Sequence, residues 1–282
     1  MNVCFVVNRA YIGQLKVAIY SLSKYNQKVN IIVLTHDLTQ EDKSDLSRFA
    51  RELSHNIRFI DMSDELFIGL PRMGYDKSYT AYFKLMIPYA LSDLEKVLYL
   101  DCDLLVEKSL DELYNKNTNH FMSACLDEKV NKKRIEHIKL ITGETKNYFN
   151  SGVILFDFKH QDEIVNQDVL FDYIKSNKEI FKFHDQDILN HFYINKCDHL
   201  EEKYNYVTTY KSIKDIFIHQ GGKDAVVIHY ANWKPWNNNY IGKYYKKYLK
   251  AYKTLKKNEK LNFLKRRNIF SMLKLILKYI VR

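Results

Sequence analysis

Two carboxylates stand one residue apart at the end of an apolar run. In KVLYLDCDLLV, residues 96–106, the apolar positions 97–100 lead directly to Asp101 and Asp103. An apolar run that ends in charge is typical of a buried parallel strand whose carboxyl end meets solvent, where α/β proteins bind ligands. Paired carboxylates favour Mg²⁺ or Mn²⁺, ions that often complete their coordination with substrate phosphates. The pair indicates a metal-bridged nucleotide, although an isolated D-x-D is equally consistent with a solvated acidic turn.

A histidine and a lysine later in the chain are groups that such a site would use. His229 ends a strand-like run, and Lys234 follows five residues later in HYANWKPW. A neutral imidazole is an acceptable third ligand for Mn²⁺ beside carboxylates. An ammonium group beside the metal would neutralise a departing diphosphate. A histidine after a strand is more often structural, so this prediction depends on the whole segment.

Two polar segments precede predicted buried elements. In YFNSG, Asn150 is a candidate for holding sugar hydroxyls, and Gly152 would permit close approach of the backbone. In HDQDILN, Asp185, Gln186 and Asp187 stand just before a predicted helix. The three polar side chains either line a sugar pocket or cap the helix.

Two further residues have alternative interpretations. Lys84 lies in YTAYFKLMIP, a predicted helix, and is either a phosphate contact or a solvated lysine. Tyr11 follows the first predicted strand, where it either stacks on a nucleobase or packs in the core.

The elements that position these residues alternate between strand-like and helix-like patterns. Thr39 or Thr35 is a candidate cap for the second helix. Such alternation over the first 105 residues predicts a parallel, Rossmann-like sheet. We predict strands at 3–7, 29–34, 57–60, 97–100, 152–156 and 225–229, and helices at 14–25, 40–53, 162–176 and 186–193.

Composition restricts the class of protein. The 282 residues are 46% hydrophobic, enough for a full core, yet no run of apolar residues is long enough to predict a spanning helix. The N-terminal segment reads as a strand and not as a signal peptide. Four cysteines without a CxxC pair predict buried thiols in a reducing cytoplasm.

Positive charge is concentrated in the basic tail, residues 243–282. This segment holds 14 of the 44 Lys and Arg residues and one acid, Glu259. Lysines alternate there with Tyr, Leu, Ile and Phe at roughly helical spacing, which suits a helix lying in a membrane interface. Aliphatic neighbours favour lipid over nucleic acid. We therefore predict that residues 260–282 bind the anionic inner leaflet and that no nucleic acid is bound; the alternative is an ordinary surface helix.

Taken in order, these segments resemble glycosyltransferase family 8, whose members are retaining GT-A enzymes that include glycogenin and bacterial lipooligosaccharide galactosyl- and glucosyltransferases. The resemblance covers residues 3–236 through FVVNRAYIGQLKVAIYSL, SYTAYFKL, KVLYLDCDLLV, YFNSGVILF, DQDILN and HYANWKPW. Bacterial members also often end in a basic, membrane-associating tail. The resemblance implies an α/β fold with a mixed GT-A sheet flanked by helices over residues 1–242, followed by the basic tail.

The resemblance also implies roles for matching positions. Asp101, Asp103 and His229 correspond to ligands of Mn²⁺, or of Mg²⁺. Gln186 is placed at the reacting centre, but an amide is a poor nucleophile, and Asp187 is chemically the better candidate. The remaining substrate positions are Asn8 and Tyr11 at the base, Lys84 on the donor, Cys102 within the acidic motif, Asp127 between donor and acceptor, Asn150, Asp185 and Gln186 on the sugar, Asn232 in the loop after His229, and Lys234 on the diphosphate.

The chain departs from the family pattern in four ways that affect donor binding. Lys84 replaces an arginine and so loses the bidentate fork. Asn8 and Arg9 replace acidic residues after the first strand. Asn232 replaces a glycine, and the loop from His229 to Lys234 is one residue short.

The sequence thus predicts a cytoplasmic, peripherally membrane-bound enzyme that moves glucose or galactose from a UDP-sugar to a lipid-linked saccharide with retention of configuration. An inverting enzyme with Asp127 as base is one alternative, and a non-catalytic binding protein is another. A sugar nucleotidyltransferase would need a Gly- and Arg-rich loop near the N-terminus, where this chain has only Gly13.

Overall fold

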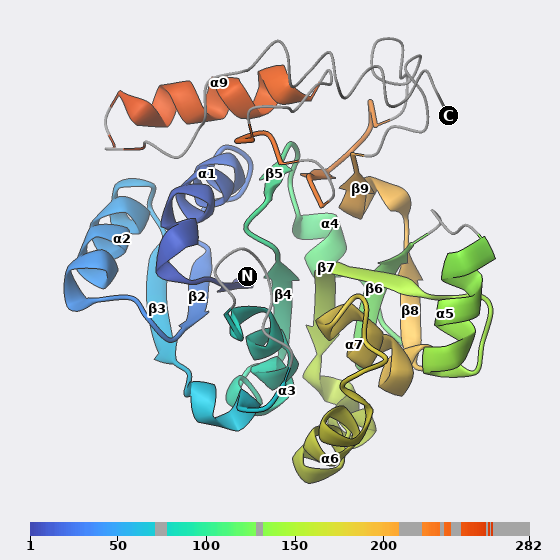
Figure 1. Ribbon diagram of the computed structural model, residues 1–282. Helices are drawn as coiled ribbons and strands as arrows, with labels where there is room; N and C mark the ends of the chain where they lie inside the picture. The colour runs from blue at the N-terminus through green and yellow to red at the C-terminus, as the bar shows by residue number, and fades with distance from the viewer. Residues whose placement is uncertain are drawn as a thin grey trace.

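A seven-stranded mixed sheet forms the centre of the computed structural model (Figure 1). The structure describes residues 1–70, 78–127, 132–208, 222–231, 234–237 and 244–257, together with 259 and 261. The strand order is β3-β2-β1-β4-β7-β6-β8. The strands are β1 Asn2–Val6, β2 Asn30–Thr35, β3 Asn56–Asp61, β4 Lys96–Leu100, β6 Met122–Leu126, β7 Phe149–Asp157 and β8 Cys197–Leu200.

The sheet is parallel through its first half and mixed through its second. Strands β3, β2, β1 and β4 are parallel neighbours, as the alternation of the first 105 residues predicts. Strand β7 then pairs antiparallel with both β4 and β6, and β6 pairs parallel with β8. The predicted α/β fold with a mixed sheet flanked by helices is thereby confirmed.

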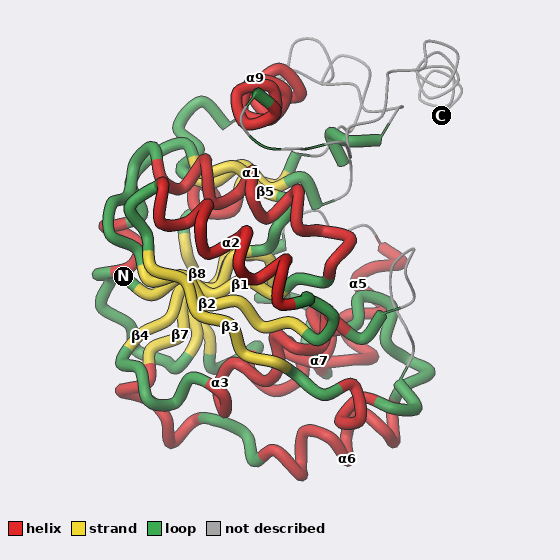
Figure 2. Tube along the Cα trace, turned by 90° about the vertical axis from the view of Figure 1, so that its left-hand side faces the viewer, coloured by secondary structure: helices red, strands yellow, loops and turns green. Residues whose placement is uncertain are grey.

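Helices cover both faces of the sheet. Figure 2 shows α1 and α2 on one side of the strands and α3, α6 and α7 on the other. The helices are α1 Ile12–Ser23, α2 Gln40–Glu52, α3 Ile87–Ala90, α4 Asp111–Tyr114, α5 Lys132–Thr142, α6 Gln167–Asn177, α7 Asp185–Tyr193 and α9 Tyr245–Lys256.

Side-chain alternation along the central strands divides the core in two. Val3 and Phe5 of β1 pack with α1 and α2, whereas Cys4 and Val6 pack with the residues on the opposite face. Successive side chains of a strand point to opposite faces, so strands buried on both sides read as continuous apolar runs. This is why the apolar runs predicted the ends of these strands to within three residues.

Capping residues set the starts of two helices. Thr39 accepts a hydrogen bond from the backbone of Asp42, whose carboxylate accepts one from the backbone of Thr39, which closes a capping box at the start of α2. Of the two predicted candidates, Thr39 is the cap. Asn166 caps α6, so this helix begins later than predicted, and a 3₁₀ segment, Phe158–Glu163, precedes it.

Several elements escaped the sequence pattern. We did not predict strands β6 and β8 or helix α5. The segment carrying Lys84 is a 3₁₀ helix, Thr80–Met86, that leads into α3.

A second, three-stranded sheet lies beside the main one. It has the order β5-β10-β9, with β5 Leu104–Val106, β9 Tyr206–Val207 and β10 Val227–His229. Helix α9 lies next to α1 in Figure 1, and its tyrosines belong to the same hydrophobic cluster as α1. The first helix of the basic tail is therefore packed on the body, while residues 262–282 lie outside the described residues.

Two further expectations can be compared with the structure. In the described part of the chain, no helix combines the length and the apolar character needed to cross a membrane. All four cysteines are free and buried.

Candidate active site

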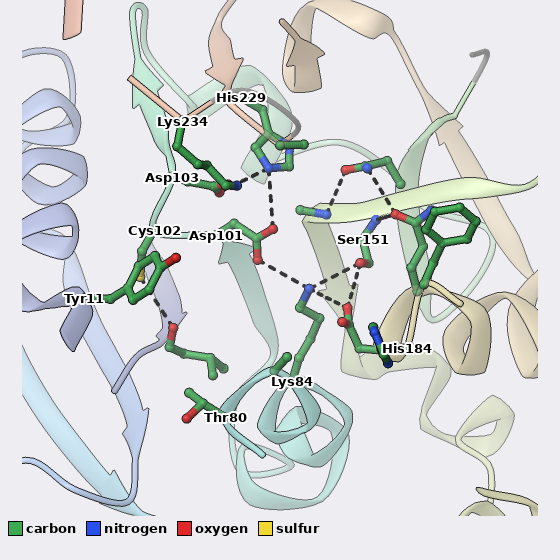
Figure 3. Close-up of a pocket in the computed structure, with 18 of the residues that line it drawn as sticks. Tyr11, Thr80, Lys84, Asp101, Cys102, Asp103, Ser151, His184, His229 and Lys234 are labelled. Carbon is green, nitrogen blue, oxygen red and sulfur yellow. Dashed lines mark hydrogen bonds and ion pairs between the residues drawn. The ribbon is translucent and has the colours of Figure 1, made fainter. Parts of the chain in front are cut away.

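A cavity of about 960 Å³ opens at the carboxyl ends of β1 and β4 (Figure 3). It lies where α/β folds bind ligands. Among the predicted site residues, those that line it are Asn8, Tyr11, Lys84, Asp101, Cys102, Asp103, Asp127, Asn150, Asp185, Gln186, His229 and Lys234. Residues far apart in the sequence are thus brought to one place, while Asn232 lies outside the described residues and Asp187 does not line the cavity.

Strand pairing brings the acidic motif and His229 together. Leu104, which follows Asp103, is the partner of His229 in the antiparallel pairing of β5 with β10. The backbone of Tyr230 also donates to the carbonyl of Asp103 at 2.9 Å. One ligand atom from each of Asp101, Asp103 and His229 lies within 4.8 Å of the others.

The orientation of His229 fits a metal ligand. The imidazole is buried, and its Nδ1 lies 2.8 Å from Oδ1 of Asn205, an acceptor, so Nδ1 carries the proton and the lone pair is at Nε2. Nε2 lies 3.5 Å from a carboxylate oxygen of Asp101 and 3.2 Å from one of Asp103. Within the described residues this atom has no hydrogen-bond partner. A lone pair facing two carboxylates is satisfied by a divalent cation, so the residues present fit a metal site.

Lys234 forms an ion pair with Asp103. Burial by itself raises the pKa of Asp103, but the charge of Lys234 and its hydrogen bond to the carboxylate outweigh burial and hold that pKa well below its usual range. The carboxylate therefore stays ionised over the physiological range. Lys234 also lines the cavity, where an ammonium can reach a diphosphate bound to the acidic pair.

Lys84 is buried between two carboxylates. Its Nζ lies 2.8 Å from Asp185 and 3.3 Å from Asp101, and it donates to Ser151 at 3.2 Å. Burial lowers the pKa of Lys84, but Asp101 and Asp185 together raise it above its ordinary value, so the ammonium remains charged. Figure 3 shows that Lys84 connects Asp101, a predicted metal ligand, with Ser151, which stands beside the predicted sugar residue Asn150.

An amide network fixes the predicted sugar pocket. Oε1 of Gln186 accepts from the side chain of Asn150 at 3.1 Å, and Nε2 of Gln186 donates to Asp127 at 3.3 Å. Arg134 forms an ion pair with the same oxygen of Asp127. Asn205 donates to Asn150 at 2.7 Å, which links this network to His229. The polar groups are therefore preorganised around the cavity.

Asp187 does not line the cavity, and its carboxylate is engaged by other protein groups. Its carboxylate is fully buried and accepts hydrogen bonds from Tyr148, from His137 and from the backbones of Lys182 and Phe183. A carboxylate with these four partners has no open face for a sugar. The geometry counts against a nucleophilic role for Asp187 and indicates that it positions the loop before α7.

Aromatic residues gather at the other end of the cavity. The rings of Tyr11 and Trp236 meet edge to face with centroids 6.1 Å apart, and both line the cavity together with Asn8. Arg9 does not line the cavity, and its guanidinium pairs with Asp42 at 3.0 Å. Of the two replacements after the first strand, Asn8 lines the cavity and Arg9 does not.

Four residues that we did not predict contribute to the site. Arg134, Asn205 and Ser151 contact predicted site residues, and His184 lines the cavity. Ser151 stands between Asn150 and Gly152, so its position in this segment could have identified it as a site residue. Arg134 and Asn205 lie in segments without a motif, and only the fold brings them here.

Comparisons with known proteins show the family of this chain. The model of glycosyl transferase family 8 matches residues 2–240. A putative glycosyltransferase of Haemophilus influenzae is 29% identical over 212 residues, covering 74% of this chain and 64% of that protein. The glycosyltransferase GlyE of Streptococcus pneumoniae is 28% identical, covering 86% of this chain and 58% of that protein. This chain thus spans about six tenths of the length of these two relatives.

Two further likenesses concern named activities. Lipopolysaccharide 1,3-galactosyltransferase of Salmonella typhimurium is 25% identical, with 84% of this chain and 73% of that protein covered. The crystal structure of the galactosyltransferase LgtC with donor and acceptor sugar analogs superposes with a TM-score of 0.77 at 24% identity, over 90% of this chain and 96% of that one, which shows a shared fold. By its match over residues 2–240, the chain belongs to glycosyl transferase family 8.

Proposed function

We propose that the protein transfers a hexose, glucose or galactose, from a UDP-sugar to a glycan of a bacterial surface glycoconjugate, with retention of anomeric configuration. The observation that carries the proposal is the cluster of Asp101, Asp103 and His229 beside Lys84 and Lys234 in one cavity. Relatives named lipopolysaccharide 1,3-galactosyltransferase and lipopolysaccharide 1,2-glucosyltransferase support the class of donor sugar and of acceptor.

Asp101, Asp103 and His229 would hold Mn²⁺, or Mg²⁺, which as a Lewis acid supplies charge stabilisation for the departing UDP. Lys234 adds a positive charge at the diphosphate. Lys84 forms an ion pair with Asp185, whose carboxylate would accept hydrogen bonds from sugar hydroxyls.

The proposed retention of configuration is based on the hydrogen bonds that occupy the carboxylate of Asp187. Because Asp187 is occupied by four hydrogen bonds, the proposal has the acceptor hydroxyl arrive on the face that UDP leaves. Asp127 lines the cavity and is held by Arg134 and Gln186, and it would serve as the base only in the inverting alternative. Nuclear magnetic resonance of the product decides the point, since inversion at the anomeric carbon would assign Asp127 the role of base in an inverting enzyme.

A thermal-shift panel tests the donor. UDP-glucose, UDP-galactose, UDP-N-acetyl sugars and GDP-mannose are each added with Mn²⁺ or with EDTA. At a hundredfold excess over Kd, the true donor should raise Tm by about 5 °C, and EDTA should abolish the shift. The variant Asp101→Asn with Asp103→Asn is the matched control and should not respond. No response of the wild-type protein to any nucleotide sugar would favour the binding-protein alternative.

We further propose that the protein binds an anionic membrane surface, where a lipid-linked acceptor is found. In α9 the apolar face is buried on the body, so attachment is assigned to residues 260–282, where Lys and Arg alternate with apolar residues. Truncation after Leu261 keeps Glu259, whose buried carboxylate forms an ion pair with Lys16. The truncated protein should lose sedimentation with anionic vesicles, and unchanged sedimentation would disprove the assignment.

A further inference from the structure

Among the residues that line the cavity, His229, His184 and Gln14 each contain a buried polar atom with no hydrogen-bond partner in the part of the chain that the structure describes. These atoms are Nε2 of His229, Nδ1 of His184 and Oε1 of Gln14. Buried polar groups are nearly always satisfied in native proteins, so each such atom requires a partner that the protein itself does not supply. For His229 that partner is the metal, and the same reasoning applies to Gln14.

Gln14 lies at the aromatic end of the cavity. It is in the first turn of α1, three residues after Tyr11, and its surface is only 4% exposed. Ala10, Tyr11 and Trp236 line the cavity with it. In Figure 3, His184, which directly precedes the sugar residues Asp185 and Gln186, lies on the other side of Asp101 from Tyr11.

The chemistry of a nucleoside diphosphate limits what Oε1 can meet. A carbonyl oxygen is an acceptor and needs a donor. Ionised diphosphate oxygens only accept, so the donors available at this end are the ribose hydroxyls and the N–H group of the base. A buried amide left unsatisfied costs stability, and this cost is recovered only when the ligand is bound.

We propose that Gln14 is a nucleoside-specificity residue, whose side-chain oxygen accepts a hydrogen bond from a ribose hydroxyl or from the base N–H of the bound nucleotide. This inference rests on the proposed function and goes beyond it, because the resemblance to the family assigned no role to position 14. It also supplies a nucleoside contact in a chain where Asn8 and Arg9 replace acidic residues.

The test compares Gln14→Met, which keeps the length of the side chain but cannot accept a strong hydrogen bond, with the wild-type protein. Calorimetric titration with UDP in the presence of Mn²⁺ should show about tenfold weaker binding by the variant. Without ligand, Tm of the variant should not fall, because an unsatisfied amide has been removed. Thr35→Val is the matched control: Oγ1 of Thr35 is buried and unpartnered among the described residues but lies outside the cavity, so this variant should bind UDP as the wild type does.

Three analogues of UDP identify the hydrogen-bond donor that Gln14 contacts. 2′-Deoxy-UDP, 3′-deoxy-UDP and N3-methyl-UDP each lack one candidate, and the analogue that lacks the partner of Gln14 should bind the wild-type protein about tenfold more weakly than UDP, yet bind Gln14→Met as UDP does. Equal affinity of Gln14→Met and wild type for UDP would overturn the inference while leaving the proposed function intact. Failure of the wild-type protein to bind UDP would overturn the proposed function itself, and the inference with it.

Discussion

Replacing Gly152 by alanine should disrupt the metal site through one methyl group. A Cβ at this position would overlap Cε1 of His229 and lie 2.7 Å from its Nδ1 and 2.9 Å from Oδ2 of Asp101. Carbon atoms in contact normally lie about 3.5–4.0 Å apart, so the imidazole must move by more than about 1 Å. That movement breaks the 2.8 Å hydrogen bond from Nδ1 to Asn205 and turns Nε2 away from the carboxylates.

The expected losses follow from this displacement. Mutation of the outer partners of a metal ligand typically costs about 10–100-fold in metal affinity, and a misplacement of about 1 Å costs about a hundredfold in rate. Overpacking costs a further 1–3 kcal/mol or so of stability. We therefore expect Gly152→Ala to bind Mn²⁺ at least about tenfold more weakly in a calorimetric titration and to unfold at a lower temperature.

A double-mutant cycle with His229→Ala separates the clash from any other effect. Removing the imidazole leaves room for the methyl group, so Gly152→Ala should cost little stability in the His229→Ala background. Wild-type affinity of Gly152→Ala for Mn²⁺, or an equal loss of stability in both backgrounds, would refute the reasoning.

Three other predictions follow from the geometry. Lys234→Met should lower kcat of sugar transfer about a hundredfold without weakening Mn²⁺ binding, because the ammonium acts on the leaving diphosphate; an unchanged kcat would contradict this. His184 has φ 49° and ψ −112°, a strained backbone for a residue with a Cβ, so His184→Gly should raise Tm by about 2–4 °C for each kcal/mol or so of strain relieved, whereas His184→Ala should not. Burial lowers the pKa of His55, whose Nδ1 accepts from the backbone of Val29 at 3.2 Å. The unfolded chain therefore binds a proton near pH 6.5 or so that the folded chain does not, and stability should fall as the pH drops from about 6.5 toward the lower folded-state pKa. Urea unfolding at several pH values should show that the free energy of unfolding depends less on pH in His55→Gln than in the wild type. An equal pH dependence in the two proteins would refute the assignment to His55.

Much of the site could be predicted because its residues stand at the ends of strands with clear apolar patterns. Asp101 and Asp103 follow β4, Gly152 lies in β7, and His229 ends β10. A polar residue that follows a buried strand must emerge at the edge of the sheet, so its place follows from local pattern alone. Family resemblance added the assignment of metal, nucleotide and sugar to these positions.

Other contributors could not be predicted because their place depends on contacts between distant segments. Arg134 lies on α5, a helix that we did not predict, and Asn205 lies in a 3₁₀ turn between short strands. Neither has a motif, yet one contacts Asp127 and the other holds His229. The direction that Asp187 faces was equally hidden, since its sequence neighbours Asp185 and Gln186 both line the cavity.

By itself, the sequence determined the alternating α/β pattern, the acidic pair at the end of β4 and the basic character of the C-terminal tail, because periodicity, polarity and charge are local properties. Only the tertiary structure decided that β5 and β10 pair and so place His229 beside Asp103, that the apolar face of α9 covers α1, and that the amide of Gln14 is buried in the cavity without a partner. These features depend on which surfaces meet, and hydrogen-bond satisfaction can be judged only when every neighbour of a buried group is known.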